Sequence, residues 1–230
     1  MKVSIHQPNF LPWIGFFSKI YKSDKFIFLN DAYVHKKNLD YLNRSLFLSN
    51  DKNKYFSIPV KKNFQTQKIL NLEIDNTKEW KKDFLNFIHS NYNVCESFKD
   101  GYSIISSIKN KDFKFLIDLN IFLIIKLFKK LNIKKNIYFS SEFKINSKST
   151  QRIIDLVKIA KGQIYLTGTG ANNYLDKNEF IKNKIKLELN QINHPIYVQK
   201  NLKSFTPGLS IIDIIMNCGL KKTEKFIKCK

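Results

Sequence analysis

Residues 2–29 read KVSIHQPNFLPWIGFFSKIYKSDKFIFL. Two short β-prone runs, KVSIH at 2–6 and KFIFL at 25–29, enclose a segment at 13–21 that places Trp, Phe and Ile at helical spacing. KFIFL is apolar without alternation, which is typical of a strand buried on both faces of a parallel sheet. The stretch therefore predicts a βαβ unit, and ligands are expected at the carboxyl ends of its strands.

The rest of the chain continues to alternate between strand-like and helix-like segments. Polar and basic residues fill 33–46, and Thr77, Ser149 and Ser210 are possible helix N-caps. No linker rich in Pro, Gly or Ser divides the chain. We therefore predict an α/β fold, a single domain over residues 1–230 with a mainly parallel sheet flanked by helices. Later strands are predicted at 55–60, 69–74, 137–139, 164–166 and 187–189, and later helices at 80–88, 102–108, 113–131, 151–160 and 211–216, the last ending at Gly219 before a basic tail.

Composition limits the class of protein. A chain of 230 residues that is 43% hydrophobic and 14% aromatic is neither a large modular enzyme nor a disordered protein. The most apolar window, 113–128, is interrupted by charged residues and falls short of the roughly 20 apolar residues of a membrane span.

No signal-peptide pattern precedes the first Pro, so we expect a cytoplasmic protein. Three widely spaced Cys predict reduced thiols, and we expect neither a metal nor a cofactor.

The chain is strongly basic, with 40 Lys plus Arg against 19 Asp plus Glu, a formal charge of +21. Such a balance is typical of nucleic-acid-binding proteins. However, 38 of the 40 are Lys, whereas nucleic-acid interfaces use the bidentate guanidinium of Arg. We interpret most of the charge as a codon preference and expect no dedicated nucleic-acid binding. The two Arg, at 44 and 152, become candidates for phosphate recognition.

Polar candidates gather where the predicted strands end. His6 and Gln7 follow the first strand, and a His there can exchange a proton near neutral pH. Asp31 follows the second strand and can bind a sugar hydroxyl or accept a proton from an amine. Arg44 with a neighbouring Lys can hold a diphosphate. Each residue also has a structural interpretation: a strand-end His satisfied in the core, an Arg paired with a buried carboxylate, or a solvated polar loop.

A glycine loop, TGTG at 167–170, follows the strand predicted at 164–166. It matches neither the phosphate-loop pattern nor the dinucleotide-binding pattern. Its Gly residues can supply positive φ angles in a turn, and successive amides there can contact a phosphate. Gly168 and Tyr174 are therefore candidates for substrate binding.

Several distinct short motifs follow one another along the chain. They are HQPNFLPWIGFF at 6–17, LND at 29–31, NR at 43–44, SIPV at 57–60, YLTG at 165–168, YLD at 174–176, HP at 194–195 and LSIID at 209–213. In this order they resemble the WbqC-like family nearly end to end. The opening HQPxxxPWxGFF is the most specific element. Two acidic residues are expected at 30 and 31 from the family pattern, and this chain has Asn30 and Asp31.

The resemblance implies a bacterial protein of O-antigen or related surface-polysaccharide gene clusters that transfers glycine or another acyl group to an amino sugar. We therefore predict an N-acyl or aminoacyl transferase that uses an activated acyl donor and a nucleotide-linked amino sugar as acceptor. His6 is the predicted catalytic base, and Asp31 orients it or the sugar. The substrate-binding candidates are Gln7, Tyr33, Lys36, Asn43, Arg44, Arg152, Gly168 and Tyr174.

Two other functions remain open from the sequence. A His after the first strand and ahead of a helix is also how nucleotidyl transferases hold triphosphates, although Gly15 is not followed by the His of their HxGH pattern. A non-enzymatic basic protein that binds polysaccharide or nucleic acid would instead gather its lysines on one face and lose affinity steeply with salt.

Overall fold

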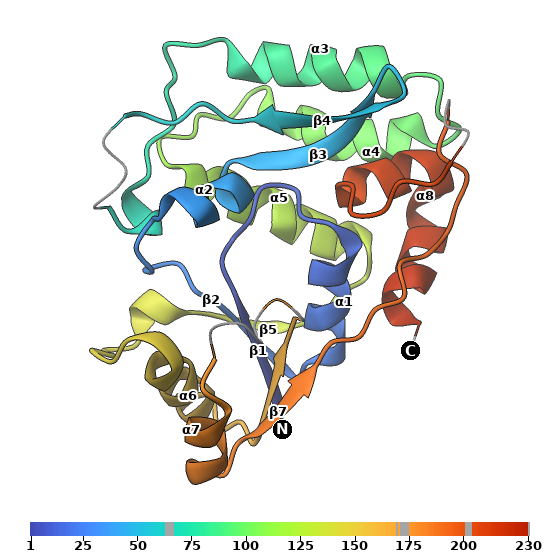
Figure 1. The fold of residues 1–230 in the computed structure, drawn as a ribbon. Coiled ribbons are helices and arrows are strands. Elements are labelled where there is room, and N and C mark those ends of the chain that lie inside the picture. Colours follow the sequence, from blue (N-terminus) through green and yellow to red (C-terminus); the bar gives the residue numbers. More distant parts are fainter. Residues whose placement is uncertain (63–66, 169, 171–174, 201–203, 230) are drawn as a thin grey trace.

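A five-stranded parallel sheet forms the centre of the protein (Figure 1). The computed structural model describes residues 1–62, 67–168, 170, 175–200 and 204–229, the side chains at 36–38 excepted. The strands lie in the order β5-β2-β1-β6-β7, and helices flank them, which confirms the predicted fold class. Their bounds are β1 (Lys2–His6), β2 (Lys25–Phe28), β5 (Asn136–Phe139), β6 (Ile164–Thr167) and β7 (Lys186–Leu189).

The chain starts in the middle of this sheet and builds it outward in two directions. From β1 it continues to β2 and β5 on one side, and it then returns to place β6 and β7 on the other. If the five strands of this sheet are renumbered 1 to 5 along the chain, their order across the sheet is 3-2-1-4-5. The direction of building reverses between β1 and β6, and ligands of open α/β sheets bind beside such a point, at the carboxyl ends of the strands.

Helices cover both faces of the sheet. Phe26 and Phe28 of β2 belong to the larger hydrophobic cluster, together with α1 (Ile14–Lys22) and α5 (Leu116–Lys130). Ile27 points to the opposite face and joins a second cluster with residues of α6 (Ser149–Ile159), while α7 (Lys177–Lys182) contributes Phe180. From Phe26 to Phe28 both faces of β2 are buried, in agreement with its continuously apolar sequence there.

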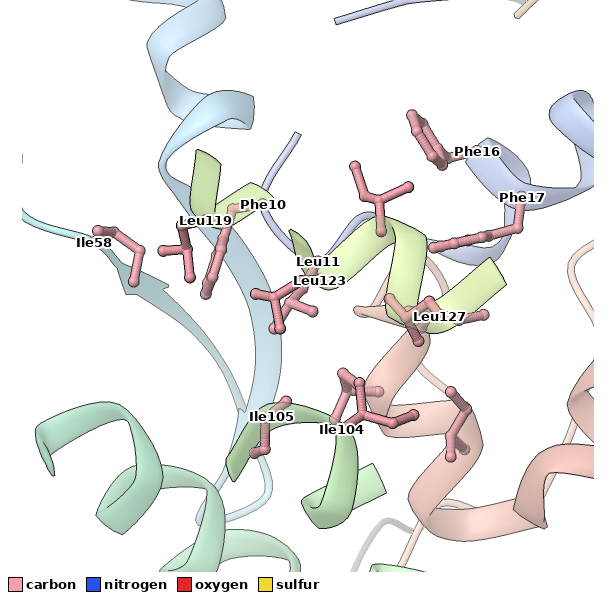
Figure 2. Packing of buried hydrophobic residues seen from close by; sticks show 14 of the residues in the cluster. Phe10, Leu11, Phe16, Phe17, Ile58, Ile104, Ile105, Leu119, Leu123 and Leu127 are labelled. Atoms are coloured by element: carbon pink, nitrogen blue, oxygen red, sulfur yellow. The ribbon is translucent and has the colours of Figure 1, made fainter. Parts of the chain in front are cut away.

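A long insertion between β2 and β5 packs above the carboxyl ends of the strands (Figure 1). Phe10 and Leu11, in the loop after β1, lie in the same hydrophobic core as apolar residues of the insertion (Figure 2). The insertion contains α2 (Lys36–Leu42), the antiparallel hairpin of β3 (Arg44–Ser49) and β4 (Lys52–Ser57), the 3-10 turn η1 (Ile69–Asn71), α3 (Trp80–Tyr92), α4 (Phe98–Ile105), the turn η2 (Ser106–Ile108) and α5. Two more elements follow β5 and β7: the turn η3 (Ser140–Glu142) and the C-terminal α8 (Ile211–Lys228).

The insertion departs most from the sequence prediction. Strand β3 was not predicted, because its first half resembles the polar segment before it. The strand predicted at 69–74 is wrong: η1 occupies its first half, and the rest forms only isolated bridges. Thr77 is not the N-cap of α3, since its hydroxyl bonds Asp75 and Glu79 precedes the helix instead. In this region hydrogen bonds from polar side chains to nearby groups stabilise local turns, which compete with the strand and helix start predicted from residue propensities.

The C-terminal helix follows the prediction in its first half. Ser210 is its N-cap, and the Oγ atom accepts a hydrogen bond from the backbone N–H of Ile212 at 3.3 Å. At Gly219 the φ angle is +75°, which breaks the helix as expected. The predicted basic tail is instead a helical continuation to Lys228. Among the helices of the described ranges, none has both the length and the apolar character needed to cross a membrane.

Candidate functional site

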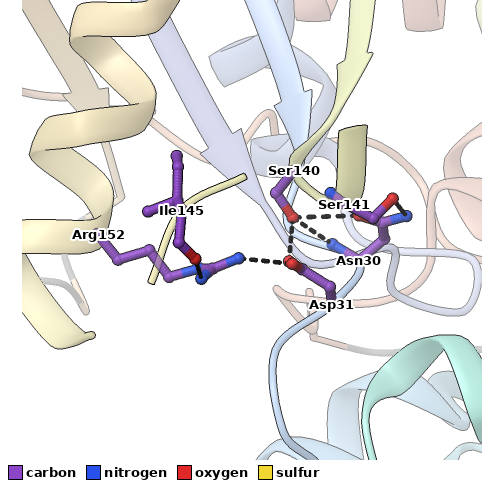
Figure 3. A network of polar contacts seen from close by, with 6 residues as sticks. All are labelled: Asn30, Asp31, Ser140, Ser141, Ile145 and Arg152. Carbon is purple, nitrogen blue, oxygen red and sulfur yellow. Dashed lines mark hydrogen bonds and ion pairs between the residues drawn. The ribbon is translucent and has the colours of Figure 1, made fainter. Parts of the chain in front are cut away.

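An ion pair joins the loop after β2 to helix α6. The guanidinium of Arg152 donates to Oδ2 of Asp31 at 2.6 Å and to the carbonyl of Ile145 at 3.0 Å (Figure 3). Both side chains are largely buried. Ser140, at the start of η3, donates to the other carboxylate oxygen of Asp31. The Asp31 carboxylate is therefore held between the ends of β2 and β5 and helix α6.

Asn30 fixes the same two strand ends to each other. Its Oδ1 lies 3.1 Å from Ser140 Oγ and accepts from the Ser141 backbone N–H at 3.0 Å, and its Nδ2 donates to Ser141 Oγ at 2.9 Å. A carboxylate at this position would lose the amide donor and would lie close to Asp31. Asn30 therefore has a positioning role, and it leaves Asp31 as the carboxylate of this network.

His6 lies at the end of β1, on the same edge of the sheet. Its ring packs edge-on against Phe16 of α1, with ring centroids 5.0 Å apart. Because its Nδ1 is 2.9 Å from the Gln7 carbonyl oxygen, which can only accept, Nδ1 carries the proton and Nε2 has the lone pair. Burial and the nearby Lys19 lower the pKa of His6 to about 3. The imidazole is therefore neutral at physiological pH.

Lys19 of α1 reaches the same place from the helix. Only 4% of the residue is exposed, and its ammonium donates at 3.1 Å to the Ile5 carbonyl, which belongs to the peptide that links Ile5 to His6. Burial lowers the pKa of Lys19 to about 7. No ion pair of Lys19 with a carboxylate occurs among the described residues. At neutral pH this lysine is partly uncharged, so two nitrogen bases lie together at the end of β1.

Arg44 does not join Asp31. On β3 its guanidinium pairs with Asp40 at 3.1 Å and stacks on the ring of Tyr55 at 4.4 Å. Asn43 also acts locally, because its Nδ2 donates to the Ile58 carbonyl at 3.0 Å and connects the end of α2 to the residues after β4. The structure thus separates the two arginines: Arg152 lies at the edge of the sheet, and Arg44 lies on the hairpin of the insertion.

The other predicted residues are distributed around this edge. Gln7 directly follows β1 and supplies the carbonyl that orients His6. Tyr33 is exposed on the loop after β2. Gly168 follows β6, and a Cβ atom there would meet nothing within 4 Å. Lys36 begins α2, but its side chain lies outside the described part of the chain, as does Tyr174 as a whole.

Sequence reasoning missed Lys19 and Ser140 as members of the site. The signal for Lys19 was a single charge inside the apolar helical run GFFSKIY. Ser140 directly follows β5 in a polar SSE segment, and a polar residue after a strand was also the signal that marked Asp31. Within the described ranges, no cluster of three or more His, Cys, Asp or Glu could hold a metal ion.

Comparison with known proteins agrees with the motifs at this edge. A sequence model of the WbqC-like protein family matches residues 7–225. The chain belongs to this family. The match to the WbqC-like family begins one residue after His6 and includes Asp31, Ser140 and Arg152. A similar protein, "Uncharacterized protein Rv1507c" of Mycobacterium tuberculosis (strain ATCC 25618 / H37Rv), is 26% identical over 231 residues, covering 100% of this chain and 99% of the relative. No solved structure matches this WbqC-like chain.

Proposed function

We propose that this WbqC-like protein is a cytoplasmic N-acyl or aminoacyl transferase of the glycyl type. Its acceptor is a nucleotide-linked amino sugar, and it acts in bacterial surface-polysaccharide biosynthesis, such as that of O-antigen and lipopolysaccharide. The observation that supports this best is the neutral His6 beside the point where the strand order reverses, with a carboxylate and a guanidinium on the same edge. The family resemblance supplies the expected chemistry.

The reaction needs a base for the attacking amine. As the sugar nitrogen bonds to the activated carbonyl carbon, its N–H protons become far more acidic, so even a weakly basic imidazole can receive one at Nε2. The acyl C–N bond forms, and the bond to the leaving group of the donor breaks. Burial keeps His6 unprotonated before the reaction, and the charged form of Lys19 adds to this effect, because a cation beside the ring opposes a second positive charge.

Asp31 and Arg152 act together in this proposal. Arg152 neutralises most of the Asp31 charge, so Asp31 orients the acceptor through hydrogen bonds and is not itself the base. In this proposal the N–H groups of Arg152 that do not bind Asp31 or Ile145 bind an anion, since a planar group with five donors can bind a carboxylate and a phosphate oxygen at once. Gln7 and Gly168 lie at the ends of β1 and β6, where a substrate bound at this edge of the sheet would approach the protein backbone.

A mass-spectrometric screen tests the acceptor class. The protein is mixed with nucleotide-linked amino sugars and activated acyl donors, and a new N-acylated product is expected. His6→Gln should lower the rate of product formation by about 100-fold or more. The control is His89→Gln, a His exposed on α3, which should keep the rate. Full turnover by the His6 variant would disprove the assignment of the base.

Nucleotidyl transfer is a second candidate, favoured by one observation. The strand order 3-2-1-4-5, with His6 after the first strand and α1 following it, is an arrangement suited to a nucleoside triphosphate. This function would release diphosphate from a triphosphate. Release of diphosphate when a nucleoside triphosphate and a sugar phosphate are added to the screen, with no acylated sugar formed, would favour it over acyl transfer.

A further inference from the structure

Trp13 is an unusual tryptophan, because 41% of it is exposed although its backbone is firmly held. Its carbonyl accepts from the Phe16 N–H at 3.1 Å as α1 begins, and it forms an isolated bridge with Ser210 ahead of α8. The chain's second tryptophan, Trp80, is 3% exposed and donates its indole N–H to Asn76. Packing of the core therefore explains Trp80 and does not explain Trp13.

Two neighbours fix the orientation of the Trp13 ring. A Cβ atom at Gly15 would lie 2.2 Å from the indole, so only glycine lets the ring lie across the first turn of α1. His194 stacks on the indole, with centroids 5.9 Å apart and planes 15° from parallel. The indole is therefore a flat aromatic surface whose orientation is set before any ligand binds.

His194 is itself held by the backbone. Its Nε2 accepts the Gly208 N–H at 3.0 Å, and its Nδ1 lies 3.2 Å from the Pro195 carbonyl oxygen. The edge of its ring meets Phe205, with ring centroids 5.3 Å apart. Both nitrogens are engaged, so His194 supports the stack and does not supply a base. Burial lowers its pKa, which keeps the supporting ring uncharged.

The aromatic surface lies at the edge of the sheet where the strand order reverses. Asn190, directly after β7, donates its backbone N–H to the Thr167 carbonyl at the end of β6, at 2.7 Å. Its side-chain Nδ2 donates to the Gly15 carbonyl at 3.4 Å. The first turn of α1, which carries Trp13, is therefore tied to the ends of β6 and β7, on the other side of β1 from Asp31.

We propose that Trp13, supported by His194 and Gly15, is a stacking platform for the nucleobase of the substrate. This rests on the proposed function, which requires a nucleotide-linked acceptor. A planar heterocycle matches a flat, preorganised and uncharged aromatic surface, and stacking on an aromatic side chain tolerates any base. The net charge of +21 attracts ligands that carry phosphates. The sugar then extends from the platform toward His6 and Asp31.

Intrinsic fluorescence can test the platform directly. Excitation at 295 nm reports only on the two tryptophans, and Trp80 serves as a buried reference. Nucleoside monophosphates are titrated into the full chain, and N-acetylglucosamine is the sugar control. We expect saturable quenching by a nucleotide and none by the sugar. The quenching should vanish in Trp13→Phe, whose remaining tryptophan is Trp80, and persist in Trp80→Phe.

Calorimetry with the same nucleotides gives a second readout. Trp13→Leu should weaken binding about tenfold or more, whereas Trp13→Phe, which keeps a ring, should lose less. Circular dichroism checks that each variant is folded. If a nucleotide binds without changing Trp13 emission, and Trp13→Leu binds equally well, the platform is refuted while the proposed function stands.

Other outcomes separate the two proposals further. Quenching by N-acetylglucosamine alone would make the platform a sugar subsite and overturn the assignment to a nucleobase. A nucleotide that stacks on Trp13 in a protein that then transfers no acyl group would preserve the platform and refute the transferase. Absence of binding by every nucleotide would overturn both.

Discussion

Replacement of Lys19 by Met should make the protein more stable at neutral pH. The ammonium is buried without a carboxylate, and its pKa falls from 10.5 to about 7 on folding. Because a tenfold change in a protonation equilibrium corresponds to about 1.4 kcal/mol, the charged lysine costs the folded state roughly 5 kcal/mol. The variant also loses the hydrogen bond to the Ile5 carbonyl, worth about 1 kcal/mol. The expected net gain is therefore about 4 kcal/mol below pH 7.

The pH dependence distinguishes this mechanism from simple repacking. Because the folded-state pKa is below that of the unfolded chain, the unfolded chain binds more protons between pH 7 and 10.5, and wild-type stability rises with pH across that window. Below pH 7 the buried Lys19 ammonium destabilises the folded state by the full amount. At pH 9.5 about 1.4 kcal/mol of this destabilisation remains, so the advantage of Lys19→Met should shrink to under about 1 kcal/mol.

Urea denaturation of both proteins at pH 6 and pH 9.5 measures the effect. Lys22→Met is the matched control, since Lys22 lies at the end of the same helix and is only half-buried. The reasoning would be refuted by a Lys19→Met protein that is less stable than wild type at pH 6, or by a gain of equal size at the two pH values.

Three further predictions concern the site and its supports. Asp31→Asn and Arg152→Gln should each cost about 3 kcal/mol, because each leaves a largely buried partner unpaired. The double variant should cost about 1–3 kcal/mol less than the sum, and additive losses in urea denaturation would argue against the pair. Gly15→Ala should displace the Trp13 ring and lower stability by about 1–3 kcal/mol, with a shift in tryptophan emission as the readout. Burial raises the pKa of Asp213 to about 6 from 3.8, so stability should fall by about 2 kcal/mol as pH rises from 4 to 6. Asp213→Asn should remove that fall, and an unchanged pH profile would show that this carboxyl is not responsible.

Local sequence determined the central layer of this protein. Residues 2–29 predicted β1, α1 and β2 correctly because a strand buried on both faces and a helix with one apolar face leave different periodicities in the sequence. The same reasoning placed His6 and Asp31 at the carboxyl ends of adjacent strands. It failed in the insertion, where short polar segments are compatible with a strand, a turn or a loop.

Tertiary structure decided which polar residues meet. Asp31 has Arg44 nearby in sequence, yet it pairs with Arg152, which is 121 residues away, because α6 returns across the sheet beside the loop after β2. The burial of Lys19 and the exposure of Trp13 follow from how α1 packs on β1 and from how Asn190, His194 and Ser210 contact the start of α1. Periodicity records which face of an element is apolar. The partner of a polar side chain depends on the strand order and the crossovers, which bring distant segments together and which no local pattern encodes.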